Sequence, residues 1–147
     1  MDNANINLNL EDEQLFLKVA NAALSEMEKT ANEINIVGVA VVAYVPEENT
    51  AGWVSKMKVV NAIADEEANF LAIAYSKASE MVLTHQDSGS ESRPILRGEF
   101  AYKGGVIRKF RSGYILATLS GAHWTLDLQV SESGLNYLEK EMKEKKE

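Results

Sequence analysis

The residues that could do chemistry in this sequence are few and lie far apart. It contains two histidines, His85 and His123, and no cysteine. Neither histidine has another four residues away, the spacing that puts two metal ligands on one helix face. His123 could act as a haem ligand or an acid–base group, although a lone histidine in a loop is more often simply solvated. Ser120 lacks the flanking glycines of a nucleophile elbow, which argues against a hydrolase.

Two pairs of small residues, Gly104-Gly105 and Ser120-Gly121, are the second candidate feature. Glycine reaches positive φ without a Cβ clash, so both pairs predict turns, and both leave backbone amides open to a small ligand. The alternative is that these glycines serve the turns alone. Asp127 follows the second pair and either belongs to such a site or caps the last helix. No GxGxxG or Walker loop is present, so no motif supports a nucleotide site.

Length, composition and charge limit the kinds of protein that this sequence can encode. A chain of 147 residues with 46% hydrophobic and 25% charged residues predicts one soluble domain, residues 1–147. The net charge of −7 argues against nucleic acid and anionic membrane surfaces as partners. The N-terminal segment has neither the basic flank nor the apolar core of a signal peptide, and no apolar run reaches the roughly 18 residues of a membrane span. We therefore expect a cytoplasmic protein without a membrane partner.

Hydrophobic periodicity and turn residues set the expected elements. A stripe at steps of three and four predicts a first helix after Asn9, which would be its N-cap. The valine-rich run 36–45 predicts a buried strand. The polar residues 1–8 and the charged residues 140–147 are expected to fray. The predicted helices are 10–32, 61–84 and 125–142, and the predicted strands are 36–45, 51–57 and three between 98 and 120, separated by turns at 104–105 and 111–113.

The predicted order α-β-β-α-β-β-β-α fits an α+β fold, in which a five-stranded antiparallel sheet has helices on its faces. Residues 84–97 are rich in serine with Gly89 and Pro94, and predict an exposed loop. A loop of this length in a compact domain is often functional. Lys77, on the second predicted helix, could reach an anionic ligand, but most helix lysines are solvated.

Several short segments, in order, resemble the GlcG/HbpS-like domain, which also forms the C-terminal part of PduO-type proteins. The resemblance covers residues 10–138. The matching segments are the alanine-rich first helix, the strand 36–45, SKA at 76–78, YKGGVI at 102–107, Ser120-Gly121 with Asp127 six residues on, and SGLNYL at 133–138. Departures include Ile115 and Thr118 where the family has glycines, and no histidine between residues 11 and 33.

The resemblance implies a three-layer α/β/α sandwich with a profilin-like sheet, homo-oligomers, and a small-ligand cleft near the glycine motif. Some relatives bind haem, so the specific expectation is a non-catalytic ligand or cofactor binder with haem as the candidate. The alternatives are a small enzyme of haem degradation or of hydroxy-acid or diol metabolism, and a structural oligomer with a degenerate cleft.

The expected site combines these features. A ligand should contact the backbone at Gly104-Gly105 and Ser120-Gly121, with Asp127 and His123 at the rim. Because the N-terminus of the last helix adds a positive partial charge, an anionic group such as a carboxylate or a haem propionate is expected there. A valine in place of Gly121 is expected to abolish binding with the fold kept, since its side chain would fill the approach to the turn.

Overall fold

The computed structural model describes residues 3–47 and 50–146, with side chains described for 8–47 and 50–145. Three helices and four strands follow one another along this part of the chain. They are α1 (Asn3–Glu33), β1 (Gly38–Val45), β2 (Val54–Val60), α2 (Phe70–Thr84), β3 (Val106–Phe110), β4 (Gly113–Ser120) and α3 (Trp124–Lys146). None of the described helices combines the length and the apolar character needed to cross a bilayer.

The strands form one antiparallel sheet in the order β2-β1-β4-β3. β1 lies in the centre and every residue in it is buried, as its unbroken apolar sequence predicts. The register places Ala40 opposite Lys58 of β2 and Leu119 of β4. β3 and β4 are joined by a tight turn at Arg111-Ser112, which confirms the second predicted turn.

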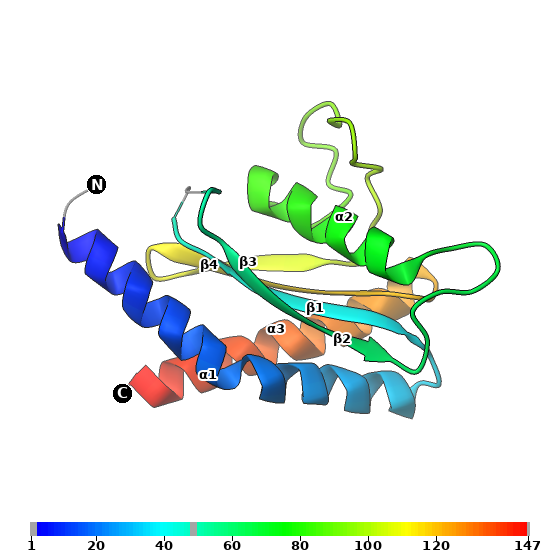
Figure 1. Ribbon diagram of the computed structural model, residues 1–147, viewed down its shortest axis with the longest axis horizontal. Coiled ribbons are helices and arrows are strands. Elements are labelled where there is room, and N and C mark those ends of the chain that lie inside the picture. The colour runs from blue at the N-terminus through cyan, green and yellow to red at the C-terminus, as the bar shows by residue number, and fades with distance from the viewer. Residues whose placement is uncertain (1–2, 48–49, 147) are drawn as a thin grey trace.

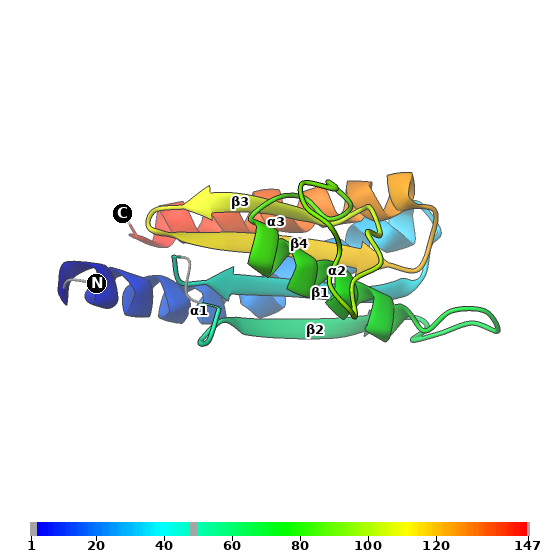
Figure 2. The ribbon, with the colours of Figure 1, turned by 90° about the horizontal axis from the view of Figure 1, so that it is seen from above.

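The sheet is covered on both faces (Figures 1 and 2). Alternate β4 residues Ile115, Ala117 and Leu119 pack with α1 and α3, whereas Leu116 packs with α2. A single helix of 15 residues therefore covers one face, and two longer helices cover the other. Both ends of the chain lie at the same end of the sheet, and β4 runs away from them to the start of α3 (Figure 1).

The predicted fifth strand is absent from the part of the chain that the structure describes, and the observed order is α-β-β-α-β-β-α. Gly98, Ala101 and Gly104 have φ values of 96°, 54° and 116°. Such left-handed conformations cannot continue an extended strand. Gly104-Gly105 consequently precedes β3 instead of turning a hairpin.

The first helix begins earlier than predicted, at Asn3, so residues 3–8 are helical. Asn9 is buried and does not cap the helix, because its Oδ1 accepts hydrogen bonds from Tyr44 Oη (3.0 Å) and Ser112 Oγ (2.9 Å). At the other end of the chain, α3 continues through most of the region expected to fray, with Met142 buried. The predictions for residues 1–2 and 147 fall outside the described residues.

The second helix begins later than predicted. Asp65 Oδ1 accepts hydrogen bonds from the amides of Glu67 and Ala68, both at 2.8 Å, a local arrangement that competes with helix formation. Asn69 then caps α2 by accepting from the Ala72 amide at 3.1 Å. The strand predicted at 51–57 also lies later in the chain than expected, as β2 (Val54–Val60).

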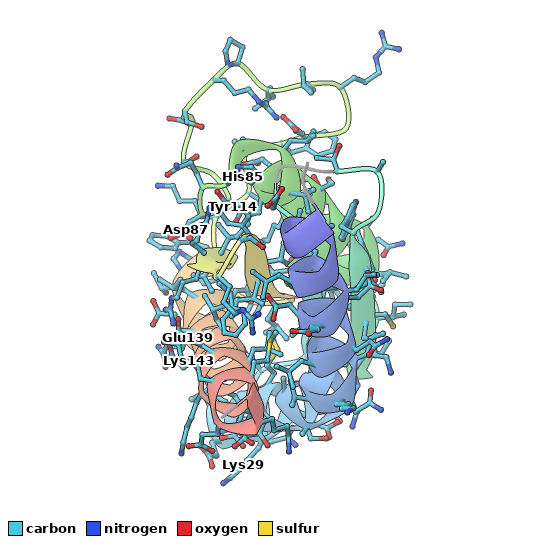
Figure 3. All side chains as sticks on the ribbon, turned by 90° about the vertical axis from the view of Figure 1, so that its left-hand side faces the viewer. Lys29, His85, Asp87, Tyr114, Glu139 and Lys143 are labelled. Atoms are coloured by element: carbon cyan, nitrogen blue, oxygen red, sulfur yellow. The ribbon has the colours of Figure 1, made fainter. Side chains whose placement is uncertain are left out.

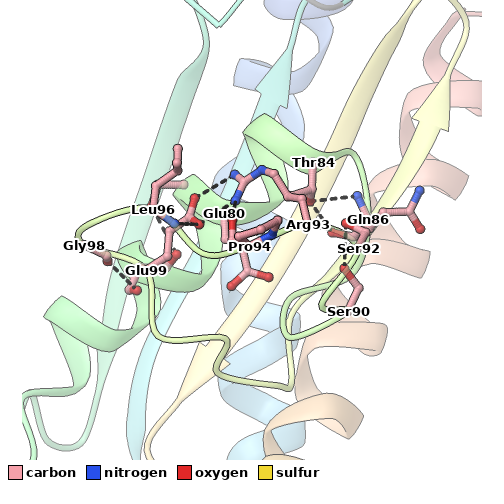
Figure 4. Close-up of polar contacts among 12 residues, drawn as sticks. Glu80, Thr84, Gln86, Ser90, Ser92, Arg93, Pro94, Leu96, Gly98 and Glu99 are labelled. Carbon is pink, nitrogen blue, oxygen red and sulfur yellow. Dashed lines mark hydrogen bonds and ion pairs between the residues drawn. The ribbon is translucent and has the colours of Figure 1, made fainter.

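The predicted exposed loop extends from His85 to Gly105 and is fastened by its own side chains (Figure 4). Arg93 donates to both carboxylate oxygens of Glu99, at 2.8 and 2.9 Å, and the Leu96 amide donates to Glu99 at 2.8 Å. These bonds hold the pKa of Glu99 at about 2. Glu80 Oε2 accepts from the Gly89 amide at 2.7 Å. The loop is therefore ordered without regular secondary structure.

The two ends of this loop are attached to the sheet. Asp87 Oδ1 accepts from the Ile107 amide at 3.0 Å, and Ser88 Oγ accepts from the Gly105 amide at 2.9 Å. His85 stacks on Tyr114 of β4, with ring centroids 4.1 Å apart (Figure 3). These contacts fix where the loop leaves and rejoins the sandwich.

Candidate functional site

A cleft of about 580 Å³ lies where α2 begins, β4 ends and α3 begins. Its lining comes from four parts of the chain: the segment before α2, α2 itself, residues 101–103 of the loop, and residues 120–127. This is the end of the sheet opposite the chain termini (Figure 1). The volume lies within the range of small-molecule sites.

A buried ion pair forms part of the cleft lining. Lys77 Nζ lies 3.1 Å from Asp127 Oδ2 and donates to the carbonyl oxygen of Leu119 at 2.9 Å. The Lys77 and Asp127 side chains are only 3% and 4% exposed. Charges so placed interact strongly, but both lose their hydration.

The local sequence explains why Lys77 reaches this position. Phe70, Ala74, Lys77, Ala78 and Met81 are all buried residues of α2, and their spacing puts them on one helix face towards the sheet. Lys77 is thus a cation within an otherwise apolar stripe.

Gly104 has no Cβ and thereby leaves space for the ion pair between Lys77 and Asp127. A Cβ at Gly104 would lie 3.1 Å from both Lys77 Nζ and Asp127 Cβ, and the φ of 116° disfavours any side chain there. Gly105 is equally enclosed, since a Cβ there would meet Met81 Cε at 2.6 Å. The backbone conformation therefore favours glycine at Gly104, whereas a side chain at Gly105 would first have to displace the end of Met81.

Asp127, in the first turn of α3, also binds the turn that precedes this helix. Its Oδ1 accepts from the Ala122 amide at 3.0 Å, and the Gly121 amide donates to the same carboxylate. The interpretation of Asp127 as a residue that binds backbone amides is confirmed, and Asp127 also lines the cleft, while its part in a ligand site stays a prediction. The Gly121 amide, one of those expected to receive a ligand anion, donates to this side chain instead, and the Gly105 amide donates to Ser88 Oγ.

Burial shifts both members of the pair towards their neutral forms. It lowers the pKa of the Lys77 ammonium despite the attraction of Asp127. It raises the pKa of the Asp127 carboxyl despite Lys77 and the two amides. Both shifts bring the pKa values of the amine and the carboxyl closer together than in an exposed pair.

Ser120 provides an unpaired hydroxyl in the same cleft. Its side chain is 1% exposed, and its Oγ has no hydrogen-bond partner in the described part of the chain. Alternation along β4 turns Ser120 and Thr118 to the α2 face. Because buried hydroxyls are nearly always hydrogen-bonded, the unpaired Ser120 hydroxyl stands out among the residues that line the cleft.

His123 lies outside the residues that line the cleft. Its Nδ1 is 2.9 Å from Thr125 Oγ1, and its carbonyl oxygen accepts the amides of Leu126 and Asp127 at the start of α3. Within the described residues, no group of three or more histidine, aspartate or glutamate side chains is placed to hold a metal ion.

Of the six residues singled out from the sequence, Ser120, Gly121 and Asp127 line the cleft. Gly121 packs directly on the backbone of the residues before β1, and a Cβ there would collide with the carbonyl oxygen of Val37. The expectation that valine at Gly121 would keep the fold is therefore wrong.

Sequence reasoning missed the aromatic rim of the cleft. Phe70, Tyr102 and Trp124 line it, and Lys103 Nζ lies 5.2 Å from the centre of the Trp124 ring, a cation–π distance. These residues come from three separate segments, and no spacing in the sequence links them.

Comparisons with known proteins identify the fold. No family model and no curated protein matches this sequence. Among solved structures, this chain is similar to protein ORFY of Klebsiella pneumoniae, assigned to DUF336, the GlcG-like family. The TM-score is 0.58 at 17% identity, over 83% of this chain and 88% of that one. This likeness shows a shared fold, as the resemblance in the sequence implied.

Proposed function

We propose that this chain is a small-ligand-binding protein that holds its ligand in the cleft beside Lys77, Ser120 and Asp127. The observation that carries the proposal is the unpaired Ser120 hydroxyl next to a buried ion pair in a cleft of about 580 Å³. Concave sites with an apolar wall and a few converging polar groups are the usual form of small-molecule sites.

The ligand that fits has a polar head and an apolar body. The head, a carboxylate or another group that accepts hydrogen bonds, would lie towards the Ser120 hydroxyl, with Lys103 at the rim supplying a further positive charge. The body would pack on Phe70 and Trp124. The amides of the Gly121-Ala122 turn contribute little, because Asp127 already accepts from them.

Haem is the specific candidate that the family resemblance implies, and its propionates are the part that such a cleft would hold. Ligation of the iron by His123 does not fit, because His123 does not line the cleft. A haem titration followed at the Soret band tests this. Stoichiometric binding that persists in His123→Ala would support a haem ligand in the cleft, whereas a sharp band lost in that variant would contradict this placement of the haem.

The direct test uses simple carboxylates as probes. We expect benzoate or hexanoate at millimolar concentration to shift the amide signals of Ser120 and Lys103 and the indole signal of Trp124 in a ¹H–¹⁵N NMR spectrum. Ser120→Ala should weaken binding several-fold. Ser133→Ala, which removes a helix hydroxyl bonded at 2.7 Å to Val130 O, is the matched control. Shifts confined to other surfaces would overturn the proposal.

Two other functions stay as alternatives. A small enzyme of haem or hydroxy-acid metabolism would convert a ligand of this cleft, and product formation would identify it. A structural oligomer would show no ligand at all.

Self-association is part of the proposal, since Ile95, Leu96 and Phe100 are 53%, 53% and 62% exposed. Light scattering at micromolar concentration tests it, and the cytoplasmic location stays a prediction.

A further inference from the structure

We propose that the ligand of this cleft carries an aldehyde or ketone carbonyl, which Lys77 captures reversibly as an imine. The inference rests on the proposed function and adds the class of ligand and the atom that binds it. It starts from three residues that line one cleft: Lys77 and Asp127, which form the buried ion pair, and Ser120, whose buried hydroxyl is unpaired.

The position of Lys77 separates it from the other lysines. Among the lysines whose side chains the structure describes, Lys77 alone is buried, and it still lines a cleft wide enough for a small molecule. Most lysines are exposed point charges that stay protonated at neutral pH. Burial lowers the pKa of Lys77, so a larger fraction of its amine is in the neutral, nucleophilic form than at an exposed lysine.

Asp127 is placed to move the proton. Its Oδ2 lies 3.1 Å from Lys77 Nζ, so it can accept the ammonium proton directly. Its other oxygen is fixed by the Ala122 amide. The carboxylate is thereby oriented with one oxygen towards the amine.

The step balances without another reactant. Asp127 takes a proton from the Lys77 ammonium, the amine adds to the carbonyl carbon to form a C–N bond as the C=O π bond breaks, and Asp127 returns its proton to the oxygen. Asp127 then takes a second proton from nitrogen and returns it to the hydroxyl, which leaves as water. The product is a protonated imine on Lys77 paired with the Asp127 carboxylate, and one water has been released.

Ser120 has a defined part in this scheme. Lys77 Nζ is bonded to the carbonyl oxygen of Leu119, the residue before Ser120, so the hydroxyl and the amine lie at the same end of β4. A hydroxyl without a protein partner can donate to the carbonyl oxygen and hold the carbon towards the amine. Ser120 is a positioning residue in this account.

The experiment traps the imine. The full chain is incubated at pH 7 with butanal, in less than one equivalent, and sodium cyanoborohydride, and alkylated lysines are located by peptide mass spectrometry. We expect Lys77 to be modified at least tenfold faster than any other lysine. Lys58 is the matched internal control, because it also pairs with a carboxylate, Glu28 at 2.9 Å, but is 42% exposed.

Variants separate this proposal from the proposed function. Lys77→Arg keeps a cation beside Asp127 and should remove the fast modification, whereas Lys58→Arg should leave it unchanged; circular dichroism confirms that both fold. Ser120→Ala should slow modification of Lys77 while Lys58 reacts as before. If Lys77 reacts no faster than Lys58 although benzoate shifts the cleft signals, the carbonyl proposal is wrong and the binding site stands. If neither occurs, both are wrong.

Discussion

Replacing Lys77 by methionine tests the buried ion pair most directly. The substitution keeps the length and apolar stem of the side chain and removes its charge. Asp127 would then be a carboxylate that is 4% exposed and has lost its cation. Removing one partner of a buried pair costs about 3–5 kcal/mol. We expect the lower end, about 3 kcal/mol at pH 7, because the Ala122 and Gly121 amides still donate to Asp127.

Urea unfolding followed by circular dichroism measures this loss. With a denaturant slope of about 2 kcal/mol per molar urea, a loss of about 3 kcal/mol lowers the midpoint by about 1.5 M. Lys58→Met is the control, since it removes a similar but half-exposed pair with Glu28, and such pairs contribute about 0–1 kcal/mol. Adding Asp127→Asn to Lys77→Met should recover part of the loss.

The loss in Lys77→Met should also depend on pH. Burial already raises the pKa of Asp127 in the parent, and losing the Lys77 cation raises it further, so the folded variant binds more protons than the folded parent between pH 7 and that pKa. Its free energy of unfolding should therefore rise relative to the parent as the pH falls from 7 towards the raised pKa. A loss no larger than that of Lys58→Met, or one that is the same at pH 7 and pH 5, would refute the assignment of a buried ion pair.

Contacts elsewhere in the molecule give three more predictions. Tyr44→Phe removes a buried hydrogen bond of 3.0 Å and should cost about 1 kcal/mol in the free energy of unfolding, measured in urea. Arg93 holds the pKa of the Glu99 carboxyl at about 2. The ionised carboxylate should therefore stabilise the loop fully above pH 4.5, the usual pKa of the group, and lose that effect as the pH falls through 2. An NMR titration of the Glu99 side chain can follow this change. Gly134→Leu should lower the free energy of unfolding by about 1–3 kcal/mol in thermal unfolding, because a Cβ at Gly134 would already meet Met27 Sδ at 2.5 Å.

Local sequence signals predicted much of the fold. The apolar run of β1, the turn at Arg111-Ser112 and the stripes of α1 and α2 all depend on neighbours in the chain. The errors arose where a local hydrogen bond or a backbone angle differs from what the hydrophobic pattern predicts. Asp65 binds two amides and delays the start of α2, and positive φ at Ala101 interrupts the expected strand.

The site was less predictable, because its central contact joins residues 50 positions apart. The sequence marked Asp127 and Ser120 through the small-residue turn, and suggested that Lys77 could reach an anionic ligand. It could not show that Lys77 pairs with Asp127, because nothing in the spacing indicates which face of α2 meets the start of α3. His123 was selected by residue type alone, and the structure places it outside the cleft lining.

The loop from His85 to Gly105 is attached to the sheet and also forms part of the cleft wall. Its middle is fastened internally by Arg93 and Glu99, and its ends are held by the bonds of Ser88 to Gly105 and of Asp87 to Ile107. Because residues 101–103 also form one wall of the cleft, changes in this loop can reshape that wall while the strand register remains as it is. Under the proposed function, a loop grafted from a relative would be expected to change ligand selectivity at this wall without rebuilding the sandwich, whereas the buried Lys77–Asp127 pair of the same cleft also contributes to stability.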